Sequence, residues 1–331
     1  MIRAFIFVFA ALLSGVVIAP ASAQPVAAPD PGKLKLASAN AIIVDAAAGT
    51  PVYAKAADEV TPIASLTKLM TAMVTLDAGL PMDEPVAVDI GDLDYIKGTR
   101  SRLGMGVELS RGEMLRLALM ASENRASSSL ARHYPGGQAA FVAAMNRKAA
   151  ALGMTRTHFS DATGLSAENV STANDLARMV AAASQYPLIR EYSTTASYYV
   201  EVQPSGRILG FNNSNALVRD ERAGWDIVLS KTGYIREAGK CLVMLANIGS
   251  RPFVIVLLDS LGQYTRLGDA QRVRHWLETG EGLPLPGPKA STRTVSAKAA
   301  PSAKKATASP RTRVVGSMPL RATSGTPLRV R

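Results

Sequence analysis

Apolar residues near the two ends of the chain form short runs that are typical of β-strands. Residues 40–60, NAIIVDAAAGTPVYAKAADEV, contain two such runs around Gly49, which predicts two strands joined by a turn. Further strands are expected near residues 193–201 and in GWDIVLSKTGY (224–234), KCLVMLANI (240–248) and PFVIVLLDS (252–260).

Between these strands, apolar residues recur every three or four positions, as they do along amphipathic helices. A helix is expected from about Ser65 to Asp77, and another opens with a capping box formed by Ser110 and Glu113. The other helices are expected in residues 136–154, 171–187 and 268–280. This order predicts an α+β fold: a mainly antiparallel sheet of N- and C-terminal strands, flanked by helices, with a helical subdomain inserted between them.

The first 23 residues have the composition of a secretory signal peptide. A basic start is followed by an apolar run and by Ala21-Ser22-Ala23, which matches the small-residue cleavage pattern. An uncleaved membrane anchor is the alternative, but Pro20 and the small residues favour cleavage. We therefore expect a periplasmic or secreted protein that begins at Gln24, with a linker over residues 24–37 and a folded domain over residues 38–285.

The C-terminal residues 286–331 form a tail that carries the chain's positive charge. From Lys289 onward there are ten basic residues, no acidic residue and no aromatic residue, a composition typical of disordered segments. When these ten charges and Arg3 are removed from the formal net charge of +11, residues 24–288 have a net charge of zero. Anionic envelope polymers or a membrane surface are the expected contacts, or else the tail has no specific partner. Nucleic acid is not expected, because the protein is exported and no aromatic residue is present for bases to stack on.

The sequence lacks the short-range patterns of metal and nucleotide sites. His133, His158 and His275 are scattered and Cys241 is the single cysteine, so no zinc site is predicted. There is no G-x-S-x-G and no G-x-x-x-x-G-K segment, and no cofactor is predicted.

IASLTKLMTAMV (63–74) places Ser65 and Lys68 one turn apart on a helix face, where the amine can reach the hydroxyl. A lysine activates a serine only if desolvation or a neighbouring cation lowers its pKa. The spacing alone proves little, because Ser302 and Lys305 in the tail share it. The apolar residues of the helix are expected to anchor it in the core; these are Ile63, Leu66, Leu69, Met70 and Met73.

Two further motifs follow in order. Ser122-x-Asn124 stands at the end of a predicted helix, where an asparagine often serves only as a cap. Lys231-Thr232-Gly233 ends a predicted strand and offers a cation and a hydroxyl to an anionic group.

With these three motifs in this order, the sequence resembles the penicillin-recognising serine acyl-transferases, whose fold is that of the serine β-lactamases and transpeptidases. Longer segments, among them LALMASENRASSSLARHYPGG and LSKTGYIREAGKCLVM, resemble the D-alanyl-D-alanine carboxypeptidases, and within that family the periplasmic endopeptidases. The resemblance covers roughly residues 38–285.

The resemblance implies a role for each matching position. Ser65 would attack the D-alanyl carbonyl with Lys68 as general base, and Ser122 would relay a proton to the leaving amine. Asn124 would hold the substrate peptide, and Lys231, Thr232 and Gly233 would line the pocket. The backbone N–H groups of Ser65 and Tyr234 would form an oxyanion hole, and Arg251 would help to bind the substrate's terminal carboxylate. DATGL (161–165) is expected to have a structural role.

The implied substrate is peptidoglycan, with β-lactams as covalent inhibitors. The main interpretation is an endopeptidase that cleaves D-alanyl cross-links, and the alternative is a carboxypeptidase that removes terminal D-alanine. From another class, a non-catalytic peptidoglycan-binding protein remains open. No glutamate in an E-x-x-x-N pattern precedes the KTG strand, so slow release of bound β-lactams is expected.

Overall fold

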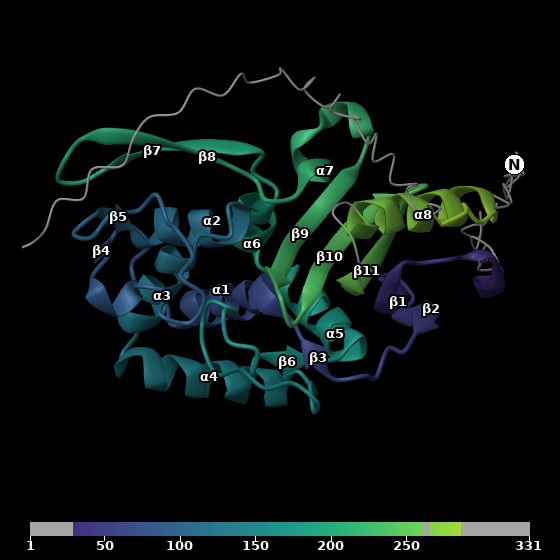
Figure 1. Ribbon diagram of the computed structural model, residues 1–331, viewed down its shortest axis with the longest axis horizontal. Helices are drawn as coiled ribbons and strands as arrows, with labels where there is room; N and C mark the ends of the chain where they lie inside the picture. The colour runs from purple at the N-terminus through teal and green to yellow at the C-terminus, as the bar shows by residue number, and fades with distance from the viewer. Residues whose placement is uncertain (1–28, 261, 263–264, 286–331) are drawn as a thin grey trace, which may run out of the picture. The chain divides into compact units, whose positions relative to one another are not determined.

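The computed structural model of the protein describes residues 29–260, 262 and 265–285 (Figure 1). The predicted signal peptide and the basic tail lie outside these residues, as does the first part of the predicted linker. The last part of that linker is packed: Leu34 and Leu36 are buried, and the Trp276 indole N–H donates a hydrogen bond to the Asp30 carbonyl.

A five-stranded antiparallel sheet brings the two ends of the folded region together. Its strands, in spatial order, are β2 (Thr50–Lys55), β1 (Ser38–Asp45), β11 (Arg251–Ser260), β10 (Gly239–Ile248) and β9 (Asp226–Ile235). The first strand therefore pairs with the last, with Ser38 opposite Ser260. This arrangement confirms the predicted α+β fold.

Helices cover both faces of the sheet, which explains why its central strands read as continuous apolar runs. Figure 1 shows the sheet between α8 (Thr265–Thr279) and α5 (Ala173–Ala183). Along β11, Ile255 and Leu257 join the cluster of buried side chains that includes Trp276 of α8, whereas Val254 and Val256 join the other cluster. Successive side chains of a strand point to opposite faces, so each face has its own core.

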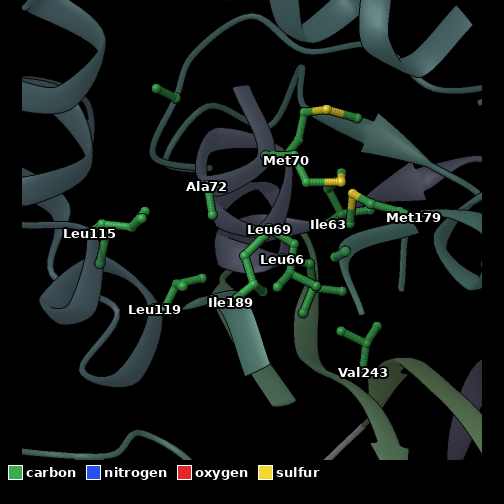
Figure 2. Close-up of a cluster of buried hydrophobic side chains, with 14 of the residues drawn as sticks. Ile63, Leu66, Leu69, Met70, Ala72, Leu115, Leu119, Met179, Ile189 and Val243 are labelled. Carbon is green, nitrogen blue, oxygen red and sulfur yellow. The ribbon is translucent and has the colours of Figure 1, made fainter. Parts of the chain in front are cut away.

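The second core extends into a helical region built around α1 (Lys68–Asp77), which follows the single turn η2 (Ala64–Thr67). The other helices of this region are α2 (Arg111–Met120), α3 (Asn124–Arg132), α4 (Gly137–Ala151) and α6 (Pro187–Ser193). Figure 2 shows apolar side chains gathered around α1 from several of these elements and from β10. The five apolar residues predicted to anchor this helix are fully buried, which confirms that prediction.

Short elements complete the fold. They are the strand pairs β3 (Thr61–Pro62) with β6 (Val170–Ser171), β4 (Pro85–Ala87) with β5 (Glu108–Ser110) and β7 (Ser197–Val202) with β8 (Arg207–Asn212), and the short helices η1 (Pro31–Lys33), η3 (Ile90–Asp92), α7 (Ala216–Arg219) and η4 (Glu221–Ala223). None of the helices within the described ranges is long and apolar enough to cross a membrane.

Candidate active site

Ser65 lies in the turn η2, directly before α1, and Lys68 is the first residue of that helix. The Lys68 side chain is completely buried, and its Nζ atom has three neighbours. It lies 2.9 Å from Ser65 Oγ, 2.8 Å from Asn124 Oδ1 and 2.6 Å from the Thr163 carbonyl oxygen. Two of these partners are carbonyl oxygens, which only accept, while the Ser65 hydroxyl can also donate.

This environment suits a neutral amine at Lys68. A neutral amine has two N–H donors and one lone pair, so it can donate to both carbonyl oxygens and accept the Ser65 proton. Burial is the largest cause that lowers the Lys68 pKa, to about 7, although the charges of Asp161 and Glu123 act in the opposite direction. The arrangement can therefore remove a proton from Ser65 near neutral pH.

The loop DATGL holds the Thr163 carbonyl against Lys68. The Asp161 carboxylate accepts hydrogen bonds from three backbone N–H groups of the loop, those of residues 163, 164 and 166, and from the Thr163 hydroxyl. These bonds fix the turn from which the carbonyl projects. The expectation that this segment is only structural missed the Thr163 carbonyl, because backbone groups leave no signal in a residue motif.

Ser122 and Asn124 come from the turn between α2 and α3. Ser122 has a φ of 59°, in the left-handed region, and its Oγ lies 2.8 Å from Lys231 Nζ. Asn124 is the first residue of α3 and does not cap the end of the preceding helix. Its amide nitrogen donates to the Thr99 hydroxyl, so one side chain connects Lys68 to the loop around residue 99.

Lys231, Thr232 and Gly233 lie within β9, the edge strand next to η2. Lys231 is buried, and its pKa is lowered well below the usual value by that burial and then by the charges of Lys68 and Arg266. The Thr232 hydroxyl donates to Ser214 Oγ at 2.7 Å.

Two glycines allow the nucleophile's turn to be enclosed from both sides. A Cβ on Gly164, whose φ is +79°, would lie 2.0 Å from the Ala64 carbonyl oxygen. A Cβ on Gly233 would lie 2.9 Å from the Ile63 carbonyl oxygen and 3.3 Å from the Ser65 nitrogen. Any larger residue at either position would move the turn that carries Ser65.

A cavity of about 410 Å³ opens above these groups. Its lining comprises Ser65, Lys97, Thr99, Ser122, Asn124, Leu165, Thr232, Gly233, Tyr234, Ile235, Arg236 and Arg266. Lys68 and Lys231 are not in this lining, but each is hydrogen-bonded to a serine that is: Lys68 to Ser65, and Lys231 to Ser122. A second cavity of about 590 Å³ shares Asn124 and Leu165 with the first and continues between α3, α4 and the loop of residues 91–96.

Arg251 does not belong to this site, contrary to the expectation. It is the first residue of the central strand β11, at the end of the sheet where Ile248 of β10 is its partner. There it forms an ion pair with Asp45 and packs over the Phe253 ring. Lys231 pairs with Val243, which lies five residues along β10 from Ile248. The distance along the strands therefore keeps Arg251 from the cavity.

Two arginines line the cavity instead, Arg236 in the turn after β9 and Arg266 of α8, and Arg266 is the one held against the backbone of the sheet. The Arg266 guanidinium donates to the backbone carbonyls of Gly233 and Cys241, at 2.8 Å and 3.2 Å. The sequence prediction missed Arg266 because a helical position six residues after the end of β11 reveals nothing about the strand that its side chain reaches. No group of three or more potential metal ligands occurs among the described residues.

The geometry agrees with what comparison to known proteins finds. Residues 24–262 match the D-alanyl-D-alanine carboxypeptidase family, peptidase S11. The chain belongs to this family.

Two relatives share nearly half of their aligned residues with this chain. The D-alanyl-D-alanine endopeptidase of Escherichia coli (strain K12) is 48% identical over 277 residues, which cover 83% of this chain and 89% of that protein. The D-alanyl-D-alanine endopeptidase of Pseudomonas aeruginosa is 47% identical, over 82% of this chain and 87% of that protein.

Among solved structures, the Streptomyces K15 DD-transpeptidase superposes with a TM-score of 0.68 at 28% identity, over 74% of this chain and 98% of the other. Both the sequence and the fold of the folded region thus place it in the S11 family.

Proposed function

We propose that this protein is a serine D,D-peptidase of peptidoglycan that cleaves D-alanyl cross-links between peptide stems. The observation that carries the proposal is the fully buried Lys68, whose amine lies 2.9 Å from Ser65 Oγ with two carbonyl oxygens as its other partners. The S11 match and the two endopeptidase relatives support the choice of substrate.

In the proposed reaction, Ser65 Oγ attacks the carbonyl carbon of a D-alanyl residue and gives its proton to the Lys68 amine. The C–N bond then breaks, and the leaving nitrogen receives a proton through Ser122, which Lys231 holds at 2.8 Å. Water then attacks the resulting ester and gives one proton to the Lys68 amine, which passes it to Ser65 Oγ as the ester C–O bond breaks. The stem leaves as a new carboxylic acid and loses the second water proton to solvent.

The developing negative charge on the carbonyl oxygen would be stabilised by the backbone N–H groups of Ser65 and Tyr234. The proposal is supported by the close approach of β9 to the turn that carries Ser65. Loss of one donor of this kind typically costs about 3 kcal/mol of transition-state stabilisation.

Asn124 would bind the acyl-donor peptide, and Thr232 with Arg266 would face the carboxylate of the leaving group. The choice of Arg266 in place of Arg251 is supported by its position: Arg266 lines the cavity and donates to the Gly233 carbonyl, whereas Arg251 is not among the lining residues.

The decisive experiment is digestion of purified cross-linked stem dimers and of pentapeptide monomers, with product separation. We expect the wild type to convert dimers into monomers. Release of free D-alanine alone, from pentapeptides only, would establish the carboxypeptidase alternative instead.

A fluorescent penicillin tests the role of Ser65 directly. The wild type should be labelled covalently and remain labelled after the free compound is removed, because no aspartate or glutamate occurs among the described residues that line the cavity. Ser65→Ala should not be labelled. Persistent labelling of that variant would contradict the assignment of the nucleophile.

We also propose that the enzyme acts in the periplasm or outside the cell after the first 23 residues are removed, and that the ten basic residues of the tail bind anionic envelope polymers or a membrane surface.

A further inference from the structure

The loop of residues 94–99 forms one lip of the cavity and is fixed by its own hydrogen bonds. The Asp94 carboxylate accepts from the backbone N–H groups of Ile96, Lys97 and Thr99, and from the Thr99 hydroxyl. Thr99 in turn accepts a hydrogen bond from the Asn124 amide. The loop is therefore tied to the side of the site where the proposed function places the acyl-donor peptide.

An ion pair joins this loop to the opposite lip. Lys97 Nζ lies 2.6 Å from Glu237 Oε1, and Glu237 belongs to the turn between β9 and β10. Lys97 lines the same cavity as Ser65, and 27% of its side chain is exposed. Glu237 does not line the cavity and is more exposed, at 41%.

The charge around the cavity has one sign. Among the described residues that line it, the charged side chains are Lys97, Arg236 and Arg266, all of them cations. Arg266 is engaged with two backbone carbonyls, whereas Arg236 is exposed and takes part in none of the ion pairs formed by described residues. Glu237 is thus the carboxylate beside the two cations that are not bonded to the backbone carbonyls, Lys97 and Arg236: it pairs with Lys97 and directly follows Arg236 in the sequence.

We propose that Lys97, assisted by Arg236, binds a second carboxylate of the substrate, on the acyl-donor stem, and that Glu237 occupies this cation in the free enzyme. The inference rests on the proposed function and specifies its substrate: a stem whose diamino acid carries a free side-chain carboxylate.

Exchange of Glu237 for a substrate carboxylate is energetically feasible. An exposed ion pair contributes little net free energy, because solvent screens it and two long side chains must be ordered. The substrate carboxylate would replace one anion by another at Lys97, so Lys97 stays paired. Glu237, whose side chain is already 41% exposed, would then be fully hydrated, which stabilises its charge.

The test measures cleavage of two cross-linked stem dimers, in which the side-chain carboxylate of the donor's diamino acid is either free or amidated. For the wild type, we expect a lower KM with the free carboxylate. Lys97→Gln should raise KM about two- to fivefold for the free form, the range expected for a partly exposed ion pair, and leave KM for the amidated form unchanged.

Glu237→Gln provides the discriminating result. If Glu237 competes with the substrate, its removal lowers KM for the free form, so the two halves of one ion pair act in opposite directions. If the Lys97–Glu237 pair only held the loop in place, Lys97→Gln and Glu237→Gln would change KM in the same direction, equally for the free and the amidated dimer. That outcome would overturn the inference.

A matched control is available in the exposed pair between Lys33 and Glu281, which are 2.7 Å apart and distant from the cavity. Lys33→Gln should change neither KM. Labelling by a fluorescent penicillin separates the two hypotheses. A Lys97→Gln variant that labels normally and keeps the full wild-type preference for the free carboxylate refutes only the carboxylate site. A wild type that neither labels nor cleaves either dimer refutes the proposed function, and the inference with it.

Discussion

The protonation of one buried side chain sets the conditions under which this site can react. Lys68 has no carboxylate as a direct partner; its amine lies against a hydroxyl and two carbonyl oxygens. Such partners stabilise an ammonium less than water or a carboxylate does, so desolvation lowers its pKa. The same three contacts orient the lone pair toward Ser65, so position and basicity have one structural origin.

The rate of acylation should therefore depend on pH through Lys68. Its pKa is about 7, so below that pH the amine is protonated and cannot accept the Ser65 proton. We expect the second-order rate of acylation by a penicillin to fall about tenfold per pH unit below 7 and to level off above it. Stopped-flow measurement between pH 5 and 9 checks this.

Circular dichroism at each pH is the control for folding. A rate that stays constant down to pH 5 in a folded protein would show that Lys68 is not the base.

Among the structural elements, loops and turns determine the geometry of the active site more than helices and strands do. The turn η2 lies between the DATGL loop and strand β9, and a glycine provides the close approach on each side. On the side of the DATGL loop, Gly164 has a left-handed backbone and lies directly against the Ala64 carbonyl. No L-amino acid can therefore replace it without moving the backbone.

Gly164→Ala should abolish acylation. Its Cβ would overlap the Ala64 carbonyl oxygen, so either the loop or the turn must move, at a cost of about 1–3 kcal/mol or more. Gly153→Ala is the matched control, because Gly153 also has a positive φ of 69° but no atom within 4 Å of the added Cβ.

Penicillin labelling and thermal unfolding should be measured for both variants. The control should lose about 1 kcal/mol and keep its labelling. If Gly164→Ala is labelled as fast as the control, the close approach is not needed for reactivity.

The elements with strong periodicity could be predicted from the sequence, and those with small or polar buried faces could not. The sheet strands and α1 matched because their apolar residues are regularly spaced. Helix α3 was missed, since its sequence NRASSSLAR buries mainly alanine and serine. Helix α6 was also missed. Its first residue is Pro187, and a proline after an apolar-periodic segment predicts the end of one helix as readily as the start of another.

The same distinction applies to the site. Side chains in short motifs, such as Ser65 with Lys68, were found because a helix fixes their relative position. Arg266 and the Thr163 carbonyl were not found, and Arg251 was placed wrongly, because each depends on which strand a distant segment packs against. The spacing of residues within a short motif contains no information about how distant segments pack together.

At the scale of the whole molecule, charge is separated along the chain. Residues 24–288 have a net charge of zero and the tail from Lys289 carries ten positive charges. Electrostatic attraction to an anionic surface should therefore come from the tail and leave the chemistry of the folded domain unchanged.

Truncation after residue 288 tests this separation. We expect the truncated protein to lose co-sedimentation with vesicles that contain anionic lipid and with purified anionic wall polymer, while penicillin labelling stays equal to that of the full chain. Binding by the full chain should weaken as salt rises from 50 mM to about 500 mM, because screening shortens the range of the attraction. Equal binding by both proteins would refute the role of the tail.

The pairing of β1 with β11 has a consequence for how the protein folds. Every proposed catalytic residue, from Ser65 to Tyr234, precedes β11 in the chain, yet β9 is held in place through β10 and β11. Contacts between residues so far apart in sequence form late, because closing a long loop costs entropy before any packing repays it. A nascent chain that ends at β10 thus contains every proposed catalytic residue but lacks the strand that joins β10 to β1, and Arg266. We therefore expect activity to begin only after β11 and α8 have packed onto the sheet.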